Sequence, residues 1–456
     1  MRIPPSPPSI DALLTKYVEQ ADTFHLTKLL AMDLGVCDER GRYVHWDKLR
    51  FAIPPQGLSS QDYWFVIKWA RNKLARKLNL ADQQGKPMQF CVTDGMLQSL
   101  HWLDQHAAGQ IAMPQPLANA ATRDQYLVSS LIEEAISSSQ LEGASTTRDV
   151  AKAMLQQQRA PCDKSEQMIV NNYHAMQVIA DLKDEPLSPG LVFHLHQILT
   201  EKTLDDPAKA GKFRVDSDQI QVVDNRDGQV LHTPPPESSL AQRLQNLCDF
   251  ANNDDPKQFI HPVIKAIILH FMLGYDHPFV DGNGRTARAL FYWYMAKTGY
   301  WLTEFVSISK VLKQAPAQYA KAYLHTETDD NDLTYFLIHQ IEVLQKAIDE
   351  LFAYLAHKTR EITQTEQMLK HSKLSGQLNH RQLDILRQAL KQDHKVFTIE
   401  AHRLKHSTSY QTARTDLLSL SDQYGLLDKR KQGKGFVFYV PDDLITRIDA
   451  SNQGQS

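Results

Sequence analysis

Residues 277–288 bring together, in one short segment, the side chains that phosphate-transfer chemistry requires: HPFVDGNGRTAR. The segment lies between two apolar stretches with helical spacing, so we expect a loop that leads into the start of a helix. Gly282 and Gly284 permit positive φ angles and a close approach of a ligand to the backbone. The start of the following helix adds unpaired N–H groups and a partial positive charge. The segment therefore predicts a phosphate cradle.

The charged and polar side chains of this segment extend the prediction. Asp281 offers a hard oxygen ligand of the kind that Mg²⁺ takes beside substrate phosphates. Arg285 and Arg288 supply planar donors for phosphate oxygens, and Asn283 can add a neutral hydrogen bond. His277 is the one group of the loop that can accept a proton near neutral pH. Each residue alone is typical of a turn or a solvated helix face, and only their combination indicates chemistry.

The loop matches the HPFx(D/E)GNGRxxR signature without a departure and therefore resembles the catalytic loop of Fic-domain proteins. The resemblance implies a nucleotidyltransferase, a protein adenylyltransferase (AMPylator) that moves AMP from Mg·ATP to a Ser, Thr or Tyr hydroxyl of a target protein. His277 would be the catalytic base for that hydroxyl. Phe279 would point into the helical core and fix the loop.

The same resemblance assigns the phosphate contacts. Asp281 would hold the Mg²⁺ that bridges the α- and β-phosphates. The turn from Gly282 through Asn283 to Gly284 would cradle phosphate oxygens. Arg285 would bind near the β-phosphate, and Arg288 would bind the γ-phosphate.

The elements that must position this loop are predominantly helices, which predicts a mainly α fold. Apolar residues recur at helical spacing in a series of segments from about 116 to 365. These segments are Asp124 to Glu142, Glu166 to Leu182, Pro189 to Lys202, Glu237 to Asn252, Val263 to Tyr275, Arg285 to Thr298 and Leu333 to Ala356. We interpret residues 116–365 as the Fic helical domain.

A second motif lies upstream, at the end of the segment of about 124–143. Ser138 and Glu142 are four residues apart and share one helix face, and Gly143 is suited to end the helix in a left-handed conformation. The pattern Ser138xxxGlu142Gly143 resembles the inhibitory motif (S/T)xxxE(G/N) of Fic proteins. It implies that Glu142 pairs with Arg288 and occupies the space of the γ-phosphate, in the subclass inhibited from an N-terminal helix. In some relatives this glutamate also positions a water that removes AMP.

A β-hairpin is predicted at about 211–231, where two β-branched runs flank Asp227-Gly228. With its GKFR entry and HTPPP exit it matches the flap of Fic proteins, which holds an extended target segment by main-chain pairing. Tyr319 and Tyr323, four residues apart, are candidates for the adenine pocket, although core packing is the more common role for such a pair.

The C-terminal region, 376–445, is predicted to be a winged helix-turn-helix. Its order is a helix from Arg381 to Lys391, a short segment from Phe397 to Leu404, a helix from Ser409 to Leu420, and two strands around a basic turn. Residues 370–440 contain 13 Lys and Arg against 6 Asp and Glu. This local charge favours a polyanion such as DNA, with Lys429 to Lys434 as a basic wing, and protein docking is the alternative.

Composition sets the remaining bounds. With 456 residues, 42% hydrophobic residues and a net charge of −3, the chain is typical of a soluble protein of two or three domains. No segment has the roughly 20 apolar residues that would cross a membrane. The N-terminus lacks a secretory signal and the four cysteines form no CxxC pair, so we expect a cytoplasmic protein with reduced thiols. Residues 1–115 contain a helix-like run from Ser60 to Leu78, and their role is not evident.

Two other functions stay open at this stage. The first is a DNA-binding regulator whose Fic domain senses ATP without using it, an alternative that the intact His277 disfavours. The second is a Fic enzyme with another donor, since relatives transfer UMP, GMP or phosphocholine. Self-modification and a homodimer also remain open, and the sequence does not identify the target protein.

Overall fold

The structure is a computed structural model that describes residues 1–19, 23–55, 57–108, 120–224, 226–371, 373–390, 396–406, 408–432 and 435–453. The chain forms two compact units, one reaching Leu351 and the other beginning at Phe352. The predicted boundary near residue 115, the predicted helix end at Lys391 and part of the basic turn lie outside the described residues.

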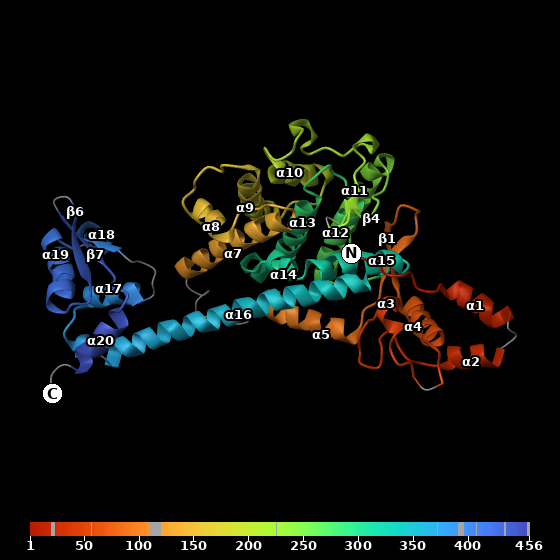
Figure 1. Cartoon of the computed structure of the whole chain (residues 1–456), viewed down its shortest axis with the longest axis horizontal. Helices are drawn as coiled ribbons and strands as arrows, with labels where there is room; N and C mark the ends of the chain where they lie inside the picture. Colours follow the sequence, from red (N-terminus) through yellow and green to blue (C-terminus); the bar gives the residue numbers. More distant parts are fainter. Residues whose placement is uncertain are drawn as a thin grey trace. The chain divides into compact units, whose positions relative to one another are not determined.

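The first unit is built almost entirely of helices, as predicted (Figure 1). Its elements are α1 (Ile10–Glu19), α2 (Thr23–Ala31), α3 (Trp46–Leu49), α4 (Ser60–Leu74), β1 (Arg76–Ala81), β2 (Pro87–Phe90), α5 (Asp94–Leu103), α7 (Ala120–Leu141), α8 (Arg148–Gln156), α9 (Lys164–Leu182), α10 (Pro189–Thr200), β3 (Val222–Val223), β4 (Val230–His232), α11 (Glu237–Asn252), α12 (Pro262–Asp276), α13 (Asn283–Lys297), α14 (Ile308–Gln314), α15 (Pro316–Thr328) and the beginning of α16 (Thr334–His371).

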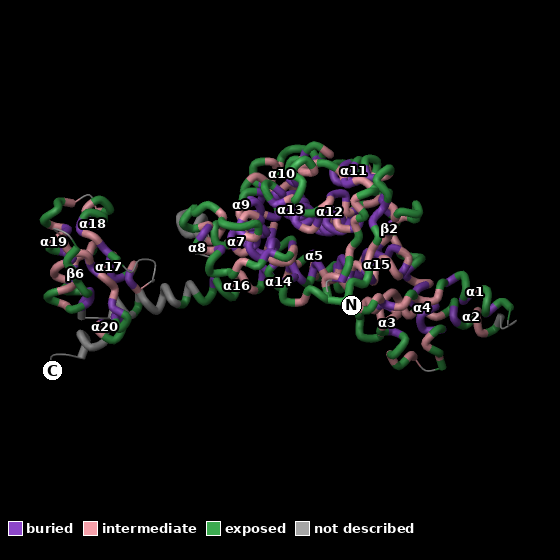
Figure 2. Tube along the Cα trace, turned by 45° about the horizontal axis from the view of Figure 1, so that its top comes forward, coloured by how far each residue is buried: buried purple, intermediate pink, exposed green. Residues whose placement is uncertain are grey.

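Helices α12 and α13 form the centre of this unit and lie side by side. Residues 263–273 of α12 are all buried, which explains why this helix is apolar on every side. Figure 2 shows buried residues gathered along α12 and α13, while α9 and α10 are exposed on their outer faces. The loop between α12 and α13 is the predicted catalytic segment, so the most buried helix pair of the unit supports it.

The N-terminal residues pack into the same unit as the helical domain. Lys68 of α4 forms an ion pair of 2.5 Å with Asp329, next to the end of α15. Arg71 donates to the Tyr335 hydroxyl of α16 at 2.7 Å and lies 3.6 Å from the ring centre of Tyr43. The N-terminal region therefore supports the helices α15 and α16 from one side.

One element differs from its prediction within this region. The helical pattern that begins at Ser60 was expected to continue to Leu78, but α4 ends at Leu74 and the strand β1 begins at Arg76. Leu78 and Leu80 are buried and alternate with more exposed residues, as in a half-buried strand that pairs with β2. Burial through strand pairing thus overrides the helical spacing of the apolar residues.

The second unit combines helices with a small three-stranded sheet. It contains α17 (His380–Leu390), β5 (Val396–Thr398), α18 (Ile399–Lys405), α19 (Tyr410–Leu418), β6 (Asp428–Gln432), β7 (Gly435–Tyr439) and α20 (Leu444–Gln453). The strands pair in the order β5-β7-β6, antiparallel throughout. Leu386, Leu417 and Phe438 are fully buried in a core of its own. The strand β5 and the helix α20 had not been predicted.

Candidate active site

The loop after α12 holds His277 in an unusual conformation. His277 ends the helix with φ 45° and ψ 55°, a left-handed backbone that a non-glycine residue adopts only when its surroundings hold it there. Its Nδ1 lies 3.0 Å from the carbonyl oxygen of Gly274. Because a carbonyl only accepts, Nδ1 must carry the proton, which leaves Nε2 as an acceptor. Burial lowers the pKa of His277, so the imidazole is neutral at pH 7.

The side chains of Phe279 and Asn283 fix the conformation of the loop. The Phe279 ring is fully buried and stacks on His196 with 3.7 Å between ring centres, as predicted for a residue that points into the core. Asn283 accepts from the backbone N–H of Phe279 at 2.9 Å and donates to its carbonyl at 2.8 Å. The Asn283 amide therefore braces the loop, and the part of this residue left for a phosphate is its backbone N–H.

The phosphate cradle was predicted at the start of α13. Gly282 has φ 81° and precedes the first helical residue, so an L side chain would be strained there. The first N–H groups of α13 have no acceptor inside the helix. Asp281 is exposed at this turn, where its Oδ1 accepts from the Gly282 N–H at 2.6 Å and its Oδ2 lies 3.5 Å from Arg285. One oxygen of the carboxylate is thus weakly engaged and open to solvent.

The two predicted arginines are both buried but have different partners. Arg285 donates from NH1 to the Leu199 carbonyl at 2.7 Å, and its buried Nε has no hydrogen-bond partner among the described residues. Arg288 donates from Nε to the Ser138 hydroxyl at 2.8 Å and from NH2 to the Ser138 carbonyl at 3.0 Å. Arg288 is therefore held on helix α7.

Glu142 completes the contact between α7 and α13. Its Oε1 accepts from Arg288 NH2 at 2.8 Å. The carboxylate also lies directly over Gly284, where a Cβ atom would overlap it. Burial acts to raise the pKa of Glu142, but the charge and the hydrogen bond of Arg288, together with the charge of Arg285, outweigh it and lower the pKa. A carboxylate thus occupies the anion-binding start of α13. Gly143 has φ 95°, so the predicted left-handed end of the helix is confirmed.

A cavity of about 220 Å³ brings the predicted residues together. It is lined by residues of α7, the hairpin β3–β4, α12, α13 and α15: Glu142, Val222, Leu231, His232, Gly274, Tyr275, His277, Gly284, Arg288, Tyr319, Ala320, Tyr323, Leu324 and Glu327. Tyr319 and Tyr323 line it beside Arg288, and the Tyr319 hydroxyl lies 2.7 Å from His270 Nε2. Glu142 and Arg288, which are 146 positions apart in the chain, thus meet at one cavity.

Sequence reasoning did not single out two residues that position this site. Arg214 donates from Nε to the His277 carbonyl at 2.8 Å and from its backbone N–H to the Pro278 carbonyl at 2.9 Å. His232 contacts Glu327 and the carbonyl of Tyr275, both at 2.7 Å. Arg214 and His232 belong to the GKFR and HTPPP segments, which had been used to predict the flap. These segments indicated a hairpin and did not indicate that the two side chains position the site.

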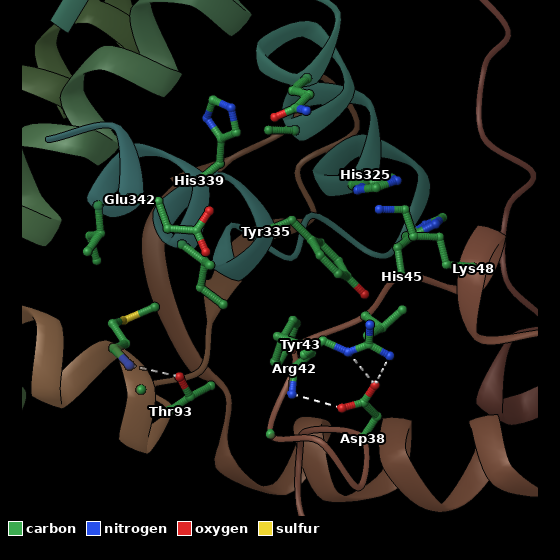
Figure 3. Close-up of a pocket in the computed structure, with 18 of the residues that line it drawn as sticks. Asp38, Arg42, Tyr43, His45, Lys48, Thr93, His325, Tyr335, His339 and Glu342 are labelled. Carbon is green, nitrogen blue, oxygen red and sulfur yellow. Dashed lines mark hydrogen bonds and ion pairs between the residues drawn. The ribbon is translucent and has the colours of Figure 1, made fainter. Parts of the chain in front are cut away.

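A larger cleft of about 700 Å³ lies on the other face of α15 (Figure 3). Figure 3 shows His45 and His325 side by side, with Glu342 across the cleft. Ligand atoms of His45, Asp47 and His325 lie within 4.8 Å of one another. However, His45 Nδ1 accepts from the Asp47 N–H at 3.1 Å, Thr328 lies 3.3 Å from His45 Nε2, and Lys321 pairs with Asp47 at 2.6 Å. The cluster is thus largely satisfied by protein groups.

Comparisons with known proteins bear on the first unit. Residues 186–295 match the Fic/DOC family. The chain is 36% identical over 94 residues to the protein adenylyltransferase Fic of Nematostella vectensis, and 36% identical over 95 residues to that of Drosophila willistoni. Each alignment covers 21% of this chain, and 20% and 17% of the two relatives. The chain thus spans about a fifth of the length of the curated relatives that it matches.

Among solved structures, a Fic family protein from Desulfovibrio desulfuricans superposes with a TM-score of 0.51 at 16% identity, covering 77% of this chain and 98% of the other. At that identity the match concerns the fold alone. None of the described helices is long and apolar enough to span a membrane.

Proposed function

We propose that this chain, which contains a Fic domain in residues 186–295, is a protein adenylyltransferase that moves AMP from Mg·ATP to a Ser, Thr or Tyr hydroxyl of a target protein. The observation that carries the proposal is the state of His277. Its Nδ1 donates to the Gly274 carbonyl, which leaves the lone pair of Nε2 free to accept a proton. His277 lines the same cavity as Arg288 and as Gly284 at the start of α13.

In the proposed reaction His277 acts as general base. Nε2 takes the proton of the target hydroxyl while the oxygen forms a bond to the α-phosphorus of ATP. The bond from that phosphorus to the bridging oxygen of the β-phosphate breaks, and pyrophosphate leaves with the electron pair. The Gly274 carbonyl stabilises the imidazolium that forms, because it accepts from Nδ1–H. Arg214, which holds the His277 carbonyl, keeps the base aligned.

The phosphates would lie at the start of α13. The backbone N–H groups of the turn from Gly282 to Gly284 would contact their oxygens, as at other helix N-termini. Arg285 is close to Asp281 and would add positive charge under the β-phosphate. Asp281 fits Mg²⁺, because it is an exposed carboxylate with one weakly engaged oxygen, and this metal binds one or two carboxylates beside phosphates. When bound, Mg²⁺ would neutralise phosphate charge.

Glu142 would inhibit this reaction. Its carboxylate pairs with Arg288 and lies over Gly284, where the γ-phosphate is expected. Two anions cannot share that position, so ATP could bind only in an unproductive pose. Ser138 supports the inhibited state, because it accepts from Arg288 through both its hydroxyl and its carbonyl. If Glu142 swings out, the same carboxylate could orient a water molecule for the removal of AMP.

The remaining wall of the cavity would bind the adenine and the target. Tyr319 and Tyr323 offer aromatic surface for the base. The hairpin β3–β4 lies at the other side and exposes Val223 and Val230. Its free edge is suited to pair with an extended target segment and bring a hydroxyl to His277.

The proposal is tested by incubating the protein with α-³²P-labelled ATP and Mg²⁺ and following label on protein, including self-labelling. Wild type, Glu142→Gly and the double variant Glu142→Gly/His277→Ala are compared. We expect strong labelling in the single variant only. Equal labelling of the double variant would exclude His277 as the base. Labelling from UTP or GTP in place of ATP would favour another nucleotide donor.

The second unit supports a further candidate function, binding of double-stranded DNA. The helix α19 exposes Tyr410, Gln411 and Thr415, side chains that can reach base edges from a major groove. The strand β6 exposes Lys429, Arg430 and Lys431, which could contact phosphates as a wing. A docking surface for another protein is the alternative.

This second candidate is tested by the fluorescence anisotropy of a labelled duplex at increasing salt. Replacement of Lys429, Arg430 and Lys431 by alanine should reduce the slope of log K against log salt by roughly three. Lys257→Ala, an exposed lysine of the first unit, is the matched control. An affinity for the duplex that changes neither with salt nor with these substitutions would favour protein docking. An ATP dependence that survives His277→Ala would favour an ATP-sensing regulator.

A further inference from the structure

His232 joins the flap to two other elements of the active-site cavity. It is the last residue of β4 and pairs with Val222 of β3, so it is part of the hairpin itself. Its Nδ1 lies 2.7 Å from Oε2 of Glu327 on α15. Its Nε2 lies 2.7 Å from the carbonyl oxygen of Tyr275, near the end of α12. The ring therefore connects the flap to the helix that carries the tyrosines and to the helix that ends at His277.

The geometry fixes the protonation state of this ring. A carbonyl oxygen accepts only, and an ionised carboxylate accepts only. A neutral imidazole would therefore leave one lone pair facing Glu327 or the Tyr275 carbonyl at 2.7 Å, which is repulsive. Both contacts are attractive when both ring nitrogens carry protons, and the ordinary pKa of a glutamate is well below that of histidine. The two contacts therefore favour an imidazolium at His232.

The charges that face the ring are mixed. Glu327 and Asp276 favour the cation, and the charges of His232 and Arg214 act to lower the pKa of Asp276 and that of His277. Arg243 pairs with Asp276 at 2.6 Å and so offsets its charge. Burial acts to lower the pKa of His232, whose side chain is 9% exposed, but the hydrogen bond and the charge of Glu327 outweigh it and raise the pKa above 6.5.

We propose that protonated His232 is a latch that pins the flap over the catalytic cavity, and that loss of its proton frees the flap. As a positioning residue it would keep the edge of β3–β4 in register with His277 without touching the reacting atoms. Its effect on AMP transfer rests on the proposed function, because the flap presents a target hydroxyl to His277 only if the protein is an adenylyltransferase. The latch itself needs neither ATP nor a target.

The direction of the pH effect follows from the raised pKa. The folded protein with the flap closed binds the proton more tightly than a freed His232, whose pKa is ordinary. The latch is therefore complete below pH 6.5 and is lost as the pH rises through the pKa of the closed state. A flap held only by the pairing of β3 with β4 would show no such dependence.

Hydrogen–deuterium exchange of the flap peptide, residues 220–232, tests the latch in the full chain without nucleotide. After correction for intrinsic exchange, we expect the flap of the wild type to exchange about tenfold faster at pH 8.5 than at pH 6, since one charged hydrogen bond is lost. Glu327→Met keeps the approximate length of the side chain but removes both the charge and the hydrogen-bonding group, and it should make exchange fast at both pH values. His232→Gln should do the same.

Matched measurements separate this result from general unfolding. His174→Gln replaces an exposed histidine of α9 and should leave the pH dependence of the flap intact. Peptides from α12 should stay protected in every variant. A flap whose corrected exchange is equal at both pH values, or is unchanged by Glu327→Met, would overturn the latch.

The same samples distinguish failure of the latch from failure of the proposed function. Labelling by Glu142→Gly together with pH-independent flap exchange would refute the latch alone. Flap exchange that depends on pH, with no labelling by Glu142→Gly, would support the latch and refute the transferase.

Discussion

The two faces of helix α15 border two very different cavities. Tyr319, Tyr323 and Glu327 line the smaller one with His277, whereas Lys321 and His325 line the larger one with His45. Both cavities are lined by histidines, carboxylate side chains and lysine or arginine side chains. In the larger cleft, His45 is engaged at both nitrogens, and Asp47 is paired with Lys321. In the smaller cavity, Nε2 of His277 lacks a hydrogen bond to any described residue. The comparison teaches that a free lone pair at an anion site, and not cavity size or residue type, marks the candidate active site.

The strongest test of this comparison removes one histidine from each cavity. In the active background Glu142→Gly, His277→Ala should lower the rate of labelling by about 100- to 10,000-fold, the contribution of a general base. His325→Gln in the same background should change it by less than about twofold. The measurement is the initial rate with α-labelled ATP. A comparable loss in both variants would contradict the assignment of chemistry to one face of α15.

The next test exchanges one carboxylate in each cavity for its amide. Glu142→Gln should raise labelling roughly 10- to 100-fold, because a neutral amide pairs more weakly with Arg288 and repels a phosphate less. Asp47→Asn should leave labelling unchanged, but it should lower the free energy of unfolding by about 1–2 kcal/mol, since Lys321 and His325 lose a charged partner. Denaturant unfolding measures the second effect. Activation by Asp47→Asn would contradict the comparison.

A smaller effect is expected at the helix that carries Glu142. Ser138→Ala removes the hydroxyl that accepts from Arg288 Nε at 2.8 Å, and it should raise labelling about threefold to tenfold by loosening the inhibited state. Ser139→Ala is a matched control on the same helix, because the buried Ser139 hydroxyl has no hydrogen-bond partner among the described residues. Equal effects of both substitutions would indicate a change in the helix and not in the contact.

The smallest expected effect is the pH dependence near neutrality. Burial lowers the pKa of His277 below 6.5, so the base is already neutral at pH 7. The rising limb of labelling by Glu142→Gly should therefore lie at this lowered pKa, below pH 6.5, and any change above pH 7 should follow the exchange of the flap and not the titration of His277. His325 also has a pKa lowered by burial, and His325→Gln should leave the profile unaltered. A rising limb centred above pH 6.5 would show that His277 is not the base as described.

Much of this site could be predicted because its signals are local. The turn from Asp281 to Gly284 and the left-handed Gly143 depend on φ angles and hydrogen bonds within a few residues, and these follow from residue type. The helical spacing around α12 and α13 reflects burial on nearly every side. The predicted hairpin turn at Asp227-Gly228 is local in the same way: Gly228 has φ 70°.

Other features could not be read from local patterns. Asn283 was expected to contact phosphate, but its amide is used by the backbone of Phe279. The end of α4 at Leu74 depends on the pairing of β1 with β2. His232 is an ordinary residue in the sequence, and its charge follows from Glu327, which lies 95 positions away.

The sequence by itself determined the chemistry that is available: an imidazole, a glycine-lined helix start, two guanidinium groups and a carboxylate four residues after a serine. Only the tertiary structure decided which of these groups are free to act. Protonation state and pKa depend on the partners within hydrogen-bonding distance, and those partners come from helices far apart in the chain. The Gly274 carbonyl leaves His277 with one free acceptor nitrogen, whereas Glu327 and the Tyr275 carbonyl favour the protonated form of His232.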